Sequence, residues 1–193
     1  MGQSTKEVSA TSFWDGVAQT ALAVALLFVA ATFKHYGITW DEPLHLENGW
    51  RALDWYLSLG EDRRVLDFQN LYLYGALYDT LTAAAGALLP FDAYETRRLV
   101  GGLVGVAGLA AVRAQARMLA GPRAGALAVL LLLLTPEWMG QAFANPKDVP
   151  FATAAAWMGL FQIRLIRDLP RQKWSTLAAF GLAFGAALGI RVG

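Results

Sequence analysis

Residues 99–136 read LVGGLVGVAGLAAVRAQARMLAGPRAGALAVLLLLLTP, in which two apolar runs flank a short segment that carries three arginines and no acid. Further apolar blocks occupy residues 17–33, 149–163 and 174–190. Apolar residues gathered in blocks, without a period of about two or 3.6, are typical of helices that span a bilayer. Only 16% of the residues are charged, against ~25% in a soluble domain. The sequence therefore predicts an all-α polytopic membrane protein.

Small residues are dense in two of these blocks, at Gly101, Gly102, Gly105 and Gly108 and at Gly181, Gly185 and Gly189. Such residues let helix backbones approach closely in lipid, so they predict tight helix packing. Between the second and third blocks, Gly121-Pro122 predicts a turn.

The basic segments predict the orientation of the chain. They carry Arg113, Arg117 and Arg123 in one case and Arg164, Arg167, Arg171 and Lys173 in the other. Because basic loops remain in the cytoplasm, the acid-rich residues 34–96 and the loop 145–148 are predicted on the outer face. Residues 1–12 are then a cytoplasmic tail, and five spans are expected at about residues 15–33, 97–113, 123–139, 149–165 and 174–191.

The long outer loop is expected to carry two helices that lie in the membrane interface. This topology requires that residues 71–89 do not cross the bilayer, and we place Tyr72, Tyr74 and Tyr78 of this segment at the level of the headgroups. Residues 42–59 have apolar and aromatic side chains at a spacing of about three to four, which predicts an amphipathic helix.

The first apolar block and the last residues of the chain each allow a prediction. The first apolar block could be a cleaved signal peptide, but it exceeds the usual ~7–15-residue core, and an uncleaved anchor is favoured. At the other end, Arg191 lies close to the outer end of the last span and the sequence stops two residues later. We interpret the chain as the amino-terminal part of a longer protein.

Asp41 and Glu42 lie shortly after the first span, near the outer surface. A carboxylate there can accept a proton from an incoming hydroxyl or help to hold a divalent cation. Alternatively, Asp41 caps a helix that starts with Pro43 at its first position. The two roles are compatible.

The second candidate is the outer loop Asn145-Pro146-Lys147-Asp148. A lysine there is not explained by the tendency of basic residues to stay inside, and its ammonium suits a phosphate. The alternative is a solvated lysine beside Asp148, which would cap the next helix.

Three further residues are weaker candidates for the substrate site. Arg98 could meet a phosphate, Arg191 would need a partner or a ligand if it lay in the bilayer, and His45 could line a substrate pocket. Two histidines and no cysteine give no spacing of metal ligands, so no metal site is predicted and a divalent cation is left open. A net charge of +1 gives no indication of a nucleic-acid partner.

Five ordered motifs resemble one family: ITWDEPLH (38–45), YLYGALYD (72–79), RRLVGGLVG (97–105), FANPKDVPFA (143–152) and GIRVG (189–193). Together they resemble the amino-terminal part of bacterial polyprenyl-phosphate-dependent glycosyltransferases, the family-39 or dolichyl-phosphate-mannose protein mannosyltransferase type. The resemblance implies a GT-C fold over residues 13–193. It also implies a membrane enzyme of the bacterial inner membrane that moves a sugar from a polyprenyl-phosphate donor to an unidentified acceptor on the outer face, with inversion.

The resemblance also implies roles for individual residues. The acid of the first outer loop is the catalytic base in this family, which corresponds to Asp41 with Glu42 as second member. The second outer loop contributes to the phosphate site, which corresponds to Asn145, Lys147 and Asp148. Where this chain has Gln141, the family often has a histidine. Members of the family are longer than this chain, so the resemblance implies that the enzyme is incomplete here, with an inactive fragment as the alternative.

A non-catalytic membrane protein, such as a transporter segment or a scaffold, is the rival interpretation. A transporter is expected to place ionisable groups at the bilayer midplane. Here the acids gather in the outer loop, which favours a glycosyltransferase acting at the membrane surface.

Overall fold

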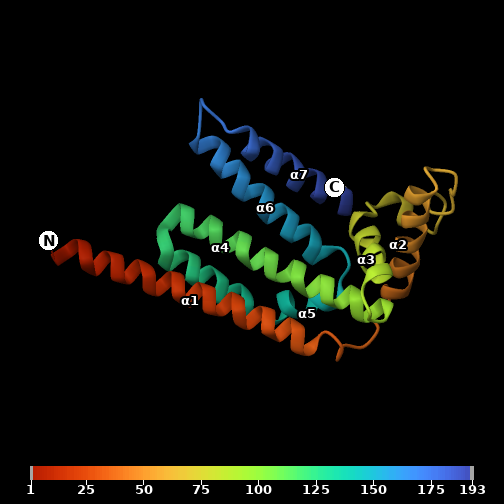
Figure 1. The fold of residues 1–193 in the computed structure, drawn as a ribbon, viewed down its shortest axis with the longest axis horizontal. Helices are drawn as coiled ribbons and strands as arrows, with labels where there is room; N and C mark the ends of the chain where they lie inside the picture. The colour runs from red at the N-terminus through yellow and green to blue at the C-terminus, as the bar shows by residue number, and fades with distance from the viewer. Residues whose placement is uncertain (1, 192–193) are drawn as a thin grey trace.

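The computed structural model describes residues 2–191, and its side chains are described for residue 11 and from residue 13 onward. All regular elements in this range are helical (Figure 1). They are α1 (Gly2–Thr32), α2 (Glu42–Leu57), the 3-10 turn η1 (Leu71–Leu73), α3 (Leu77–Leu88), α4 (Ala93–Leu133), α5 (Pro136–Ala144), α6 (Asp148–Arg167) and α7 (Trp174–Ile190).

Helix α4 consists of two antiparallel arms. Ala120 and Gly121 are not helical, and the φ of +86° at Gly121 is a conformation that glycine adopts without steric penalty. Pro122 follows and starts the second arm, as proline does readily at the first turn of a helix. The chain doubles back here (Figure 1), so the predicted turn at Gly121-Pro122 is confirmed. The arms, residues 93–119 and 122–133, take the place of the second and third predicted spans.

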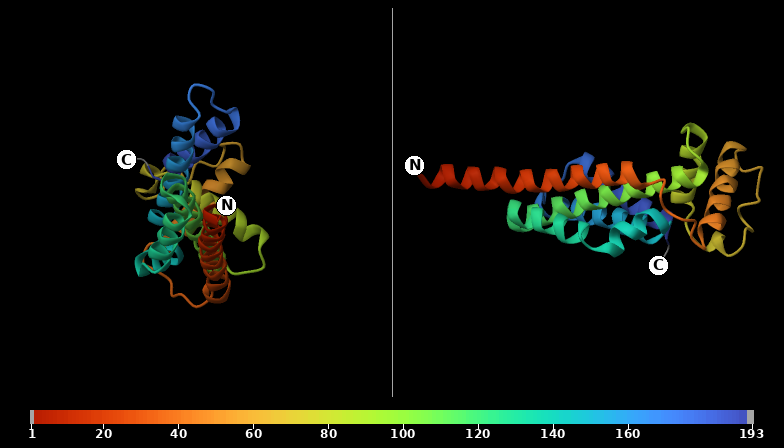
Figure 2. Two further views of the ribbon diagram at one scale, coloured as in Figure 1. Left: turned by 90° about the vertical axis from the view of Figure 1, so that its left-hand side faces the viewer. Right: turned by 90° about the horizontal axis from the view of Figure 1, so that it is seen from below.

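The long helices form an elongated bundle, and α2 and α3 lie across one end of it (Figures 1 and 2). Its main core joins α1, both arms of α4 and α5 through buried residues such as Val29, Leu109 and Phe143. A second core links α3, α6 and α7 through Tyr78, Ala154 and Ile190. Helix α3 is therefore packed against the end of the bundle, and α2 and α3 run across the direction of the long helices (Figure 1).

Three helices contain a stretch long and apolar enough to cross a membrane: α1 at residues 13–32, α4 and α6. Helix α7 is apolar but shorter. Large apolar side chains point away from the bundle, among them Leu27, Leu131 and Leu182, as suits a surface that faces lipid. The chain is an all-α polytopic protein, whereas the number of five spans and their orientation stay predictions.

The glycines of the two blocks behave differently. A Cβ at Gly102 would lie 2.7 Å from Val29, and one at Gly108 would lie 2.5 Å from Trp138, so the tight packing expected of the second block is confirmed. For the last block this expectation is wrong at Gly181 and Gly185, where a Cβ would meet no described atom within 4 Å. Both face away from the helices that the structure describes.

The outer loop differs from expectation in one segment. Residues 71–89 form the short turn η1, an extended residue at Tyr74 and then α3. The extended backbone at Tyr74 interrupts the helix, and Gly75, where a Cβ would collide with the backbone of Gly189, allows the chain to pass close to the end of α7. Tyr78 is buried and donates a 3.3 Å hydrogen bond to the Arg97 carbonyl oxygen, so its predicted place among the headgroups is wrong.

The amphipathic helix predicted for residues 42–59 is confirmed as α2. Its orientation is unusual for a globular protein, because Tyr56 and Leu57 are exposed while its polar and small residues are buried. A Cβ at Gly49 would lie 2.4 Å from the Asp79 carbonyl oxygen. Glycine thus permits close contact of α2 with α3, and polar groups meet at this contact.

Candidate functional site

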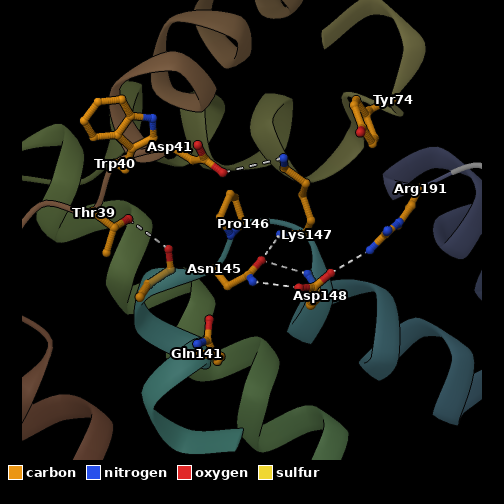
Figure 3. A pocket seen from close by; sticks show the side chains of 11 residues that line it. Thr39, Trp40, Asp41, Tyr74, Gln141, Asn145, Pro146, Lys147, Asp148 and Arg191 are labelled. Carbon is orange, nitrogen blue, oxygen red and sulfur yellow. Dashed lines mark hydrogen bonds and ion pairs between the residues drawn. The ribbon is translucent and has the colours of Figure 1, made fainter. Parts of the chain in front are cut away.

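A cavity of about 530 Å³ opens at the end of the bundle where α2 and α3 lie. Four separate parts of the chain line it: the residues before α2, the end of α5 with the loop to α6, Tyr74 before α3, and Arg191 after α7 (Figure 3). Its lining is Thr39, Trp40, Asp41, Tyr74, Gln141, Ala144, Asn145, Pro146, Lys147, Asp148 and Arg191. Five of the eight predicted site residues are therefore brought together: Asp41, Asn145, Lys147, Asp148 and Arg191.

Asn145 shapes the loop that presents Lys147. Its Oδ1 accepts hydrogen bonds from the backbone N–H groups of Lys147 and Asp148, both at 2.9 Å, and its Nδ2 donates to Asp148 Oδ2 at 2.8 Å. Such a turn, closed by an asparagine side chain, is a common way to start a helix. The predicted cap by Asp148 is wrong, since Asp148 is already the first residue of α6. Its charge still suits the positive end of the helix dipole.

Lys147 lies between an acid and an aromatic ring. Its Nζ is 3.8 Å from Asp41 Oδ2 and 5.0 Å from the ring centroid of Tyr74. The first distance is longer than a hydrogen bond, so the ion pair is loose. An ammonium carries three N–H donors, and this one can turn toward an anion that enters the cavity.

Arg191, which was expected to need a partner at the end of the last span, forms an ion pair with Asp148. Its Nη1 lies 2.8 Å from Asp148 Oδ1 (Figure 3), which joins the end of α7 to the start of α6. Lys147 and Arg191 thus face Asp41 and Asp148, and the charged side chains that line the cavity balance.

Asp41 stands at the N-cap position of α2 but makes no capping hydrogen bond with its side chain. The alternative in which Asp41 acts as a cap is therefore wrong, and the helix begins at Glu42 with Pro43 behind it. Glu42 Oε2 instead accepts the N–H of Thr39, which lies before the helix, at 2.9 Å, so it fixes the preceding loop and does not cap the first turn of α2. The carboxylate of Asp41 is left half exposed toward Lys147.

Glu42 itself is buried and does not line the cavity. Its Oε1 lies 3.4 Å from Nε of Arg98, which is buried as well and also absent from the cavity lining. Next to this pair, Thr39 Oγ1 donates to the Ala144 carbonyl oxygen at 3.2 Å and links the two loops that form the cavity. The geometry makes Glu42 a support of the loop that carries Asp41.

The last predicted residue, His45, belongs to a buried network centred on Asp79. His45 Nδ1 lies 2.6 Å from Asp79 Oδ2, Asn48 Nδ2 donates to the same oxygen at 2.9 Å, and Arg97 contacts Oδ1. Arg97 also donates to Thr82 Oγ1 at 3.1 Å. Burial alone would raise the pKa of Asp79, but the hydrogen bond from His45 and the charge of Arg97 outweigh burial and hold that pKa below its usual value.

Sequence reasoning missed Asn48 and Asp79 as members of this network, and it considered Arg97, like Arg98, only as a contact for a phosphate or for the interface. The available signal was the acid at Asp79 inside an apolar block, because an ionisable group in such a place needs a partner. Tyr74 was noticed only as an interfacial residue, although it packs against Lys147. Within residues 2–191, no three His, Asp or Glu side chains converge as metal ligands would.

These features define the class of protein: an apolar helical membrane bundle with a charged cavity at one end. The model of the family described as dolichyl-phosphate-mannose-protein mannosyltransferase matches residues 80–192, more than half of the 193-residue chain. The chain belongs to this family and is an integral membrane glycosyltransferase. No curated protein and no solved structure matches it.

The family match confirms the resemblance and favours an enzyme over a transporter or a scaffold. The matched region contains the loop 145–148, Arg98 and Arg191. It begins at residue 80, after Asp41, Glu42 and His45, so the part of the first outer loop that carries these three residues lies outside it. The roles of all these residues stay predictions.

Proposed function

We propose that this chain transfers a sugar from a polyprenyl-phosphate carrier to a hydroxyl acceptor on the outer face of a bacterial inner membrane, with its amino terminus in the cytoplasm. The observation that supports this most strongly is the meeting of Asp41 and Lys147 in one open cavity. The two residues come from loops more than a hundred positions apart, and each supplies one of the two groups that the reaction requires.

The reaction has simple needs. The acceptor oxygen attacks the anomeric carbon of the sugar, the bond from that carbon to the phosphate oxygen breaks, and the phosphate leaves with the electron pair. A cation that faces the departing phosphate stabilises its growing charge. A carboxylate on the side of the acceptor takes the hydroxyl proton. We assign the first role to Lys147, assisted by Arg191, and the second to Asp41.

The loose contact between Asp41 and Lys147 fits this scheme. A phosphate that approaches Lys147 offers a stronger, charge-assisted hydrogen bond than the carboxylate at 3.8 Å. Binding of the donor would then separate the pair and free Asp41 to accept a proton. Glu42 and Arg98 keep a supporting role, since they hold the loop that carries Asp41 from its buried side.

An apolar groove of about 520 Å³ supports a lipid-linked donor. It runs between α3, α4, α6 and α7, with Val104, Trp157 and Ala186 among its lining residues. It begins next to the cavity, because Pro150 and Ile190 line the groove and stand beside cavity residues in the chain. We assign this groove to the first isoprene units of the carrier, with the phosphate at Lys147 and Arg191.

The decisive experiment measures transfer of sugar from a polyprenyl-phosphate sugar by the purified full-length protein. Asp41→Asn keeps the shape but removes the basic carboxylate, so turnover should fall ~10²-fold or more while carrier binding is kept. Asp67→Asn, at an exposed acid of the same outer loop outside the cavity, serves as the matched control. Near-parental turnover of Asp41→Asn would remove Asp41 as the base.

Orientation has its own test, because the chain has no cysteine. A single cysteine at Glu61 should react with a membrane-impermeant reagent in intact cells, whereas one at Ala120, at the other end of the bundle, should react only after lysis. Both residues are exposed, so access alone does not decide the outcome. Labelling of the Ala120 position in intact cells would reverse the proposed topology.

A further inference from the structure

A second polar cleft, of about 560 Å³, lies at the end of the bundle far from α2 and α3, between α1, the first arm of α4 and α6. Four arginines line it together with one acid, namely Arg113, Arg117, Arg164, Arg167 and Asp15. These arginines come from two helices that are separated in the sequence, and the fold brings them together. The proposed transfer reaction uses none of them.

The acid compensates only part of this charge. Asp15 Oδ1 is 2.9 Å from Arg113 Nη2 and 2.8 Å from Arg117 Nε, and Arg117 Nη2 donates to Oδ2 at 2.8 Å. Both arginines thus share one carboxylate. Arg113 Nε is buried and has no hydrogen-bond partner in the part of the chain that the structure describes.

The arginines of α6 add further donors. Arg167 Nη2 donates to the Met118 carbonyl oxygen at 2.7 Å, which fixes its side chain across the cleft toward α4. Arg164 packs over Phe161, with its guanidinium 5.6 Å from the ring centroid. The cleft therefore presents planar guanidinium groups, whose paired N–H donors match the oxygens of a phosphate.

The surroundings place this cleft at the level of lipid headgroups. Trp14, the residue before Asp15, lies under the guanidinium of Arg123 at 5.6 Å, and tryptophan is favoured at membrane interfaces. Helices apolar enough to span a membrane, α4 and α6, pass this point. Basic pockets between membrane helices are recognised sites for anionic lipid headgroups. Arg171 and Lys173 of the neighbouring loop lie outside the cleft.

We propose that this cleft binds a phosphate group, carried by an anionic phospholipid of the leaflet at that end of the bundle. The phosphate sits between the guanidinium groups of Arg113 and Arg164 and compensates the positive charge that Asp15 does not neutralise. The lipid thereby ties α6 to the pair formed by α1 and α4. This site is separate from the donor site in position and in charge.

Native mass spectrometry of the purified protein tests the proposal, with phosphatidylglycerol and phosphatidylcholine of identical acyl chains as probes. The parent protein should retain phosphatidylglycerol in preference to phosphatidylcholine. The double variant Arg113→Gln with Arg164→Gln should lose this preference by roughly tenfold or more. The double variant Arg171→Gln with Lys173→Gln removes the same charge outside the cleft and should behave as the parent does.

Two additions make each outcome decisive. Arg113→Lys with Arg164→Lys keeps the charge and should keep part of the preference, which separates loss of binding from loss of folding. Inorganic phosphate, added at the concentration of the lipid, should not displace it. Equal retention of both lipids by the parent, or equal loss in both glutamine variants, would overturn the proposal. Full displacement by inorganic phosphate would assign the cleft to a soluble phosphate and overturn the lipid as its source.

Discussion

Asp41 and Glu42 are neighbours in the chain, yet their carboxylates enter two different environments. Asp41 is 55% exposed and meets Lys147 at 3.8 Å in the open cavity, whereas Glu42 is 2% exposed and faces Arg98 in the interior. The same division holds beyond this pair. We call the first region the open cavity (Asp41, Lys147, Asp148 and Arg191) and the second the buried cluster (Glu42, His45, Asp79, Arg97 and Arg98).

The two regions use similar residue types for different purposes. In the buried cluster, Asp79 is saturated by three side chains from α2 and α4, so the cluster joins the two cross-lying helices to the bundle. In the open cavity, the charges are paired singly and partly exposed. A saturated carboxylate has no capacity left for a substrate, while a loosely paired one has. Burial, more than residue type, separates support from candidate chemistry, since the buried pair of Glu42 and Arg98 meets only at 3.4 Å and leaves Glu42 Oε1 and Arg98 Nε without a hydrogen-bond partner among the described residues.

The largest effect is expected at the centre of the buried cluster. Asp79→Ala leaves Arg97 buried without its acid and removes the acceptor of His45 and Asn48. Breaking a buried ion pair from one side costs about 3–5 kcal/mol, so the free energy of unfolding in detergent should fall by that amount. Asp67→Ala, at an exposed acid, should change it by less than ~0.5 kcal/mol.

Lowering the pH should produce part of the same loss of the free energy of unfolding. The folded-state pKa of Asp79 is lowered from 3.8, so its contribution to stability is fully present above that value. It is lost as the pH falls through the lower folded-state pKa, because the unfolded chain binds the proton first. Parental stability of Asp79→Ala, or an unchanged acid response in it, would show that the cluster does not hold α2 and α3 in place.

The next effect concerns the open cavity and should spare stability. Lys147→Ala removes one charge-assisted hydrogen bond to the carrier phosphate, which is worth ~1.5–3 kcal/mol, or roughly a ten- to hundred-fold loss of affinity for the polyprenyl-phosphate sugar. Lys147→Arg should restore part of it, since the charge is kept and the geometry changes. Affinity and unfolding are measured on the same preparations, with Lys173→Ala as the control. Unchanged carrier affinity in Lys147→Ala would move the phosphate site to Arg191.

The comparison also shows which parts of the structure the sequence could predict. Apolar blocks define helices by local composition, and Gly121-Pro122 defines the turn of α4, so these elements were predictable. The convergence of Asp41 with Lys147 was expected only because the order of motifs resembles a known family. Spacing alone does not relate two loops that are so far apart.

The buried cluster could not be predicted in the same way. His45 and Arg97 lie 34 and 18 positions from Asp79, so the need of Asp79 for a partner was visible in the sequence, whereas the identity of its partners was not. Their meeting depends on the close approach of α2 to α3, which Gly49 permits through a contact with the backbone of Asp79. Such a contact between distant backbones leaves no periodic trace in the sequence.

The smallest effect is expected for the exposed ion pair of the open cavity. Asp148 and Arg191 meet at 2.8 Å, but both side chains are about half exposed, and exposed pairs contribute only ~0.2–1 kcal/mol. Asp148→Asn should therefore lower the free energy of unfolding by less than ~1 kcal/mol, because water can solvate Arg191 and the amide can still contact Asn145. A double-mutant cycle with Arg191→Gln isolates the coupling of the pair. A coupling of the size expected for Asp79 and Arg97 would mean that this pair, too, holds the fold together, and the division between the open cavity and the buried cluster would not stand.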